Sequence, residues 1–120
     1  MAWRYVVPTF AYVFVVQGNR WNMDARMTYD KVAALVVLGK DTLKNESTEK
    51  LGWTWTIDGI PGATVTTTDP SDSTRAEVKT HSPGTVTVTA TFANGVTNHA
   101  TIVFDPLPIV SAEIHVSEAP

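Results

Sequence analysis

Apolar and hydroxyl-bearing residues alternate along the segment Gly84–Phe104, which carries the clearest periodic pattern in the chain. In its first half, valine, alanine and phenylalanine occupy every second position, and threonine occupies the positions between them. A period of two residues is typical of a β-strand with one face buried and the other in water. A second apolar series, Ala100, Ile102 and Phe104, follows a turn. The segment therefore predicts a β-hairpin.

The turn of this hairpin follows from the need to place the apolar residues of both strands on one face. A two-residue turn of Asn94 and Gly95 would set apolar positions against threonines, because a one-residue slip reverses every side chain. A three-residue loop, residues 93–95, instead pairs Val88 with Ala100. Such loops hold their last residue at positive φ, so we expect positive φ at Gly95. An ordinary two-residue turn with a nearby bulge is the alternative.

Short segments rich in Thr, Val, Tyr and Trp recur along the rest of the chain, separated by turn residues. This spacing predicts seven to nine antiparallel strands in an all-β sandwich or barrel. The run 32–38 fits a helix or a strand, and Gly39 favours a central strand covered on both faces. Residues 17–24 and 39–50 are expected to be loops. The expected strands cover residues 3–7, 10–16, 30–38, 52–58, 63–68, 74–80, 85–92, 96–104 and 109–116.

The expected domain spans residues 1–108, and residues 109–120 form an extra edge strand or a C-terminal tail. The segment Asp105–Pro108 contains two prolines, which interrupt a strand ladder and predict a stiff linker. The residues expected to point into the core are Val13, Val36, Trp55, Val65, Val78, Val86, Val88, Phe92, Ile102 and Phe104.

Composition narrows the function classes. The 120 residues carry a net charge of −3 with scattered Lys and Arg, which argues against nucleic-acid binding. The chain has no cysteine, so a disulfide framework and a thiolate zinc site are excluded. The apolar run 5–16 is too short to span a bilayer and fits a buried strand, so we expect no membrane insertion.

Two segments resemble a known family. The sequence Ser82–Val96 with the closing strand Ala100–Phe104 is similar to the last hairpin of bacterial immunoglobulin-like domains of the invasin/intimin type. The strand Trp53–Ile57 places Trp55 at that family's tryptophan position. The resemblance covers residues 51–104, whereas the first fifty residues lack the family's Asn-Gly-Asn-Pro-Val segment. It implies an immunoglobulin-like two-sheet sandwich in an exported bacterial protein with a virulence-associated role.

No residue pattern predicts catalysis, and we expect no enzyme activity, no cofactor and no metal. The serines lie in turns without a local base, the acids lie in turns and on exposed strands, and the histidines are dispersed. Trp53 and Trp55 share a strand face and fit either an aromatic binding platform or the core, with the core favoured. Trp21, between Arg20 and Asn22 in a polar segment, is the candidate for partner binding.

The function expected from these observations is a non-catalytic recognition module that acts at or outside the bacterial cell surface. Its partner would be a protein, either a β-barrel outer-membrane exporter or a surface protein, and the module itself would be a monomer. Two alternatives stay open. A carbohydrate-binding module requires exposed coplanar aromatic rings, and a structural spacer requires rigid contacts at both ends of the domain.

Overall fold

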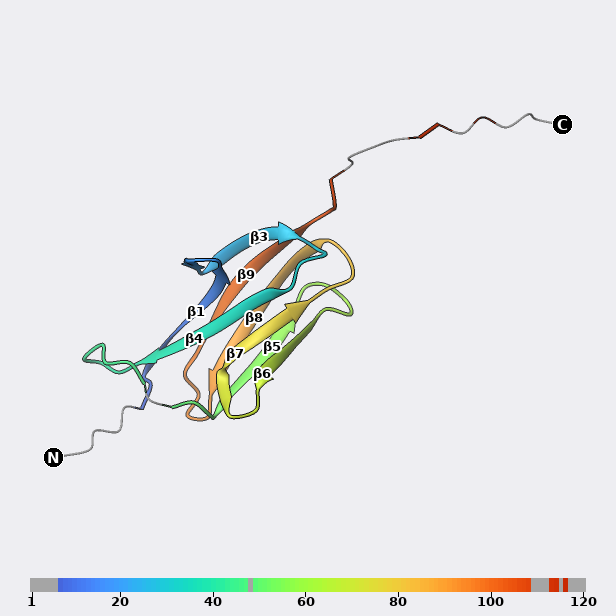
Figure 1. Cartoon of the computed structure of the whole chain (residues 1–120). Helices are drawn as coiled ribbons and strands as arrows, with labels where there is room; N and C mark the ends of the chain where they lie inside the picture. The colour runs from blue at the N-terminus through green and yellow to red at the C-terminus, as the bar shows by residue number, and fades with distance from the viewer. Residues whose placement is uncertain (1–6, 48, 109–112, 115, 117–120) are drawn as a thin grey trace.

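The computed structural model describes residues 7–47, 49–108, 113, 114 and 116, and the described residues form a two-sheet β-sandwich without helix (Figure 1). The five-stranded sheet has the order β2-β1-β4-β7-β6, and the four-stranded sheet has the order β3-β9-β8-β5. The strands are β1 (Phe10–Gln17), β2 (Arg20–Asn22), β3 (Asp24–Thr28), β4 (Ala33–Lys40), β5 (Trp53–Asp58), β6 (Thr64–Asp69), β7 (Asp72–Lys79), β8 (Gly84–Phe92) and β9 (Thr97–Asp105).

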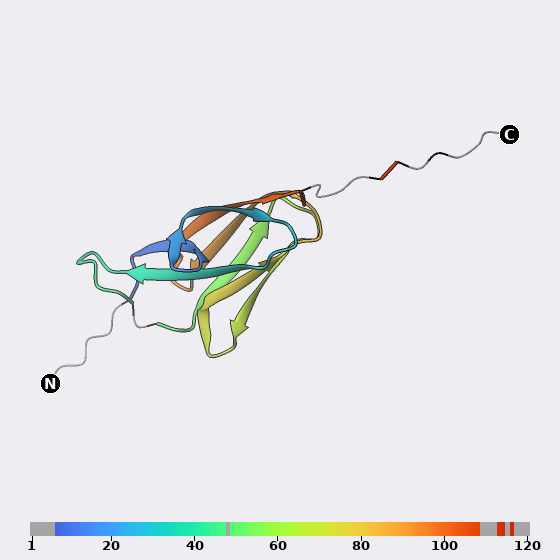
Figure 2. The same cartoon turned by 45° about the horizontal axis from the view of Figure 1, so that its top comes forward.

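The strand order is that of an immunoglobulin-like sandwich. Strands β1, β4, β7 and β6 follow the A-B-E-D order of one immunoglobulin sheet, and β5, β8 and β9 follow the C-F-G order of the other. The two layers and the turns that join them are visible from the side in Figure 2. The expected all-β sandwich is thereby confirmed. One pair departs from the expected antiparallel arrangement, because β3 runs parallel to β9.

The hairpin of β8 and β9 has the expected register. Val88 lies opposite Ala100, and the amide of Phe92 donates to the carbonyl of Val96 at 2.8 Å, which closes a three-residue loop. Gly95 has a φ of 95°, as expected for the last residue of such a loop. The apolar residues of both strands therefore face the same side.

The expected loop over residues 17–24 is wrong, because this segment forms β2 and the first residue of β3. Gly18 has a φ of 60° in a two-residue turn between β1 and β2, the position that glycine takes in a type II′ hairpin turn. The strand expected at 30–38 begins later, at Ala33, and runs to Lys40. The strands expected at 3–7 and 109–116 fall largely outside the described residues.

The core lies between the two sheets and is built from the inward positions of their strands. Six of the expected core residues are buried there, and Trp55, Val65 and Phe92 pack against it half-buried. Val36 is a correction: it is buried, yet it points away from the core, because its strand neighbours Leu35 and Val37 point inward. The six are Val13, Val78, Val86, Val88, Ile102 and Phe104.

Two polar contacts close the side of the sandwich where β1 faces β9. The amide groups of Asn98 and Asn94 donate to the carbonyl oxygens of Ala11 and Pro8, at 2.7 and 2.9 Å. The Ala11 carbonyl lies in the part of β1 that the short β2 does not reach, and the Pro8 carbonyl lies just before β1 begins. The two asparagine side chains therefore occupy carbonyl oxygens that could otherwise pair with another strand.

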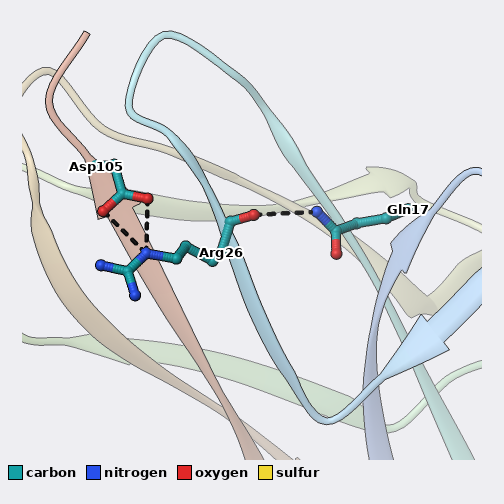
Figure 3. A network of polar contacts seen from close by, with 3 residues as sticks. All are labelled: Gln17, Arg26 and Asp105. Carbon is teal, nitrogen blue, oxygen red and sulfur yellow. Dashed lines mark hydrogen bonds and ion pairs between the residues drawn. The ribbon is translucent and has the colours of Figure 1, made fainter. Parts of the chain in front are cut away.

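An exposed ion pair joins the parallel strand β3 to the end of β9, beside their backbone ladder (Figure 3). The Nε of Arg26 lies 2.8 and 3.0 Å from the two carboxylate oxygens of Asp105. Gln17 donates from Nε2 to the carbonyl oxygen of Arg26 at 3.3 Å. Hydrogen bonding to Arg26 lowers the pKa of Asp105, and the same contact raises the pKa of Arg26. Together, the ion pair and the Gln17 hydrogen bond link β1 of one sheet to β3 and β9 of the other.

Candidate partner-binding surface

Four aromatic side chains gather on the outer face of the five-stranded sheet, and we call them the aromatic face: Phe10, Tyr12, Phe14 and Trp21. Along β1 the alternating residues Ala11, Val13 and Val15 are buried, so the three aromatic positions between them point outward. Trp21 pairs with Val16 across the β1–β2 ladder and therefore shares this outward side. Strand alternation thus creates an apolar surface on both sides of one strand.

Three rings of the aromatic face, those of Tyr12, Phe14 and Trp21, contact one another in a row. The Tyr12 and Phe14 rings are 6.4 Å apart between centroids with planes 20° apart, and Phe14 and Trp21 are 5.9 Å apart with planes 44° apart. Tyr12, Trp21 and Phe10 are 36%, 44% and 51% exposed. Exposed large rings that contact each other are the side chains that dominate protein interfaces.

A groove of about 100 Å³ adjoins the aromatic face on β4. Val36 and Leu38 lie on its apolar side, Trp21 borders it from β2, and Arg75 borders it from β7. Val36 is only 2% exposed although it faces outward, since it pairs with Phe14 on one side and Arg75 on the other. The groove is a small recess next to the exposed rings, and most of its accessible lining is polar. A polar or charged side chain of a partner could be enclosed there.

Charged residues surround this recess and give it polar rims. The chain after β4 turns back at Asp41, whose carboxylate accepts the amides of Leu43 and Asn45, and brings Glu46 beside Lys40. Glu46, Glu49 and Lys50 line the groove with Arg75. The Nζ of Lys40 lies 5.9 Å from the centroid of the Tyr12 ring, within the range of a cation–π contact. The exposed rings with these charged residues beside them match the usual anatomy of an interface, an apolar centre with a polar rim.

The structure brings only one of the three sequence-predicted site residues onto the aromatic face. Trp21 lies there, whereas its neighbours Arg20 and Asn22 point to the opposite side of β2, although they too are exposed. The aromatic residues of β1 are not among the predicted site residues, because an apolar run of this length fits a buried strand. Their alternation with Ala11, Val13 and Val15 is the signal that could have revealed an outward row.

The other aromatic candidates belong to the core. Trp53 is 5% exposed, and its ring lies 5.0 Å from that of Phe92. Trp55 is half-buried, and its Nε1 donates to the carbonyl oxygen of Ser73 on the opposite sheet at 2.8 Å. This hydrogen bond links β5 to β7. Neither ring forms part of an exposed platform.

Among the described residues, no group of three His, Asp or Glu side chains is placed to hold a metal ion. His99 is exposed on the threonine side of β9, as expected. No helix in the described ranges is long and apolar enough to cross a membrane. These observations assign no chemistry to the polar residues of the sandwich and leave the aromatic face as its candidate site.

Comparison with known proteins does not assign the chain to a family. No protein-family model matches it, and no curated protein matches its sequence significantly.

Proposed function

We propose that this domain is a non-catalytic recognition module whose aromatic face binds a protein partner. The observation that supports the proposal most directly is the row of contacting rings from Tyr12 to Trp21, in which Tyr12 and Trp21 are exposed and Phe14 is half-buried. An exposed aromatic surface keeps apolar area in water, and contact with a partner would remove it.

A protein partner fits this face better than a sugar. Carbohydrate stacking needs flat rings presented in a common plane. The Tyr12 and Phe14 planes are 20° apart, but the most exposed ring of the row, Trp21, is turned 44° from Phe14. Trp53, which such a platform would also need, is buried. The groove beside Trp21 presents charged residues of both signs, which can pair with charged side chains of a protein: Glu46, Glu49, Lys50 and Arg75. The carbohydrate-binding alternative is correspondingly weaker.

The resemblance to invasin/intimin-type domains adds a location and a partner class to the proposal. On that basis, the module works as an exported bacterial protein with a virulence-associated role, as a monomer. The partner would be a β-barrel outer-membrane exporter or a surface protein. Both offer folded protein surfaces outside the cytoplasm.

The test compares purified wild-type chain with Tyr12→Ser/Trp21→Ser as bait on a bacterial outer-membrane extract. Thr87→Ser/Thr89→Ser is the matched control, because it also alters two residues on an outer sheet face, on the opposite side of the sandwich. A captured protein is then purified and its affinity measured against all three baits. We expect the aromatic variant to bind at least about thirtyfold more weakly, the effect of losing a central aromatic anchor.

The control should bind like the wild type. Equal capture by all three baits would contradict the proposed surface, and binding of isolated glycans in place of any protein would favour the carbohydrate alternative. Both variants are checked for folding by urea denaturation before use.

A further inference from the structure

A second cavity lies at the end of the sandwich where the chain leaves β9. It has a volume of about 300 Å³ and is lined by two turns, Tyr29–Val32 between β3 and β4 and Lys79–His81 at the end of β7. The amide of Tyr29 donates to the carbonyl oxygen of Asp105 at 3.0 Å, which fixes the first turn against the end of β9. A volume of this size is typical of small-molecule sites.

Basic side chains dominate the charge around this cavity. Lys31, Lys79 and His81 line it, and Asp30 is the single acidic residue among the lining residues. The Asp30 carboxylate already accepts a hydrogen bond from the hydroxyl of Thr28. The two lysines outnumber the one aspartate although the chain as a whole carries a net charge of −3. The local potential therefore favours an anion against the overall charge of the protein.

The remaining walls are apolar or already bonded. Thr80 is buried, and its hydroxyl both donates to the carbonyl oxygen of Ser82 and accepts the Ser82 amide. Tyr29 packs against the core, and Val32 is 49% exposed. A ligand would therefore meet two kinds of surface: cationic groups on one part and apolar side chains on another.

We propose that this cavity binds a small carboxylate with an apolar body. The lysines pair with the carboxylate, and Val32 and the Tyr29 ring contact the apolar part. A neutral molecule of the same shape would lose the ion pairs, and a bare anion would lose the apolar contacts. This site shares no lining residue with the aromatic face or with the groove beside it, so the two proposals can fail independently.

The test is an NMR titration of the ¹⁵N-labelled full chain with benzoate, with its neutral analogue benzamide and with inorganic phosphate. Benzoate should cause saturable shifts of the amides of Lys31, Val32 and His81, and its binding should weaken with added salt. Benzamide and phosphate should bind more weakly by roughly tenfold, since each lacks one of the two contacts.

Lys79→Gln tests the lysine directly, with Lys44→Gln as the matched control. Lys44 lies on the loop after β4, whereas the cavity lies before β4, so both variants lose one positive charge at opposite ends of the strand. Lys79→Gln should weaken benzoate binding by about fivefold to tenfold, and Lys44→Gln should leave it unchanged. No saturable shift with benzoate, or equal weakening by both variants, would overturn the proposal.

Discussion

The two outer faces of this sandwich are built on the same scaffold and differ sharply in chemistry. The four-stranded sheet presents rows of threonines, such as Thr87 and Thr89 on β8, which suit a pleated surface in water. The five-stranded sheet presents Tyr12, Phe14 and Trp21. β-propensity explains both faces equally, because aromatic and β-branched residues are both good strand formers. Exposure of aromatic rings to water is unfavourable, whereas exposure of threonine hydroxyls is not. This unfavourable exposure is the reason to propose a binding function for the aromatic face.

The largest expected effect concerns the core that supports both faces. Ile102→Ala should lower the free energy of unfolding by about 2–5 kcal/mol, because Ile102 is fully buried between the sheets. Thr101→Ala changes the adjacent residue, which points to the threonine side, and should stay within about 0.5 kcal/mol. Urea denaturation measures both. Similar losses in the two variants would show that the threonine face is not the simple solvated surface described here.

The sequence predicts this inner and outer division well where strands alternate strictly. The register of β8 and β9 and the φ of Gly95 follow from facing alone, because a slip of one residue would expose the whole apolar series. The same reasoning fails for Val36, since β4 is apolar at consecutive positions and Val36 is buried although it faces outward. A continuous apolar run contains no signal of which residues point inward.

The candidate site was less predictable than the fold. Trp21 could be identified from its polar neighbours, but its grouping with Tyr12 and Phe14 depends on the β1–β2 pairing. That pairing follows from a three-residue strand, which is too short to show a period. Composition could not reveal the groove either, because Arg75 reaches it from a strand far along the chain. Contacts between distant segments decide both features.

The turn that carries the chain from one sheet to the other gives the next largest effect. Gly59 has a φ of 122°, and a Cβ at this position would collide with the carbonyl oxygen of Thr85. Gly59→Ala should therefore cost at least about 2 kcal/mol of stability, from backbone strain and the collision together. Gly62→Ala is the control, because Gly62 also has positive φ (82°) but open space around it. An equal cost in urea denaturation would mean that the collision relaxes freely and that the sheets are not fixed at this turn.

The third prediction compares the stability loss on truncating Trp21, on the aromatic face, with that of a tryptophan in the core. Trp21→Ser removes an exposed ring that contacts Phe14, and we expect a loss of about 1 kcal/mol in stability. A core tryptophan would cost roughly 3–5 kcal/mol when truncated. The Trp53→Phe variant, measured beside it, reports on a buried ring.

Fluorescence quenching by acrylamide gives an independent measurement of the same difference. In a Trp3→Phe background, Trp21→Phe should remove most of the quencher-accessible emission, and Trp53→Phe should remove emission that acrylamide reaches poorly. A large stability loss for Trp21→Ser, together with poor quenching of Trp21, would remove the contrast between the two faces.

The smallest expected effect is a pH dependence at the edge of the four-stranded sheet. Hydrogen bonding to Arg26 lowers the pKa of Asp105 in the folded protein, so the folded state holds the charged carboxylate more favourably than the unfolded chain does. The resulting stabilisation is present above the unfolded pKa, near pH 4, and is lost as the pH falls through the lower folded value.

In a carboxylate-detected NMR titration, Arg26→Gln should raise the pKa of Asp105 toward its ordinary value, and Lys44→Gln should not change it. Because both partners of the pair are exposed, the stability of Arg26→Gln should differ little from wild type at neutral pH. An unchanged Asp105 pKa in Arg26→Gln would mean that the parallel pair β3–β9 is held by its backbone ladder alone.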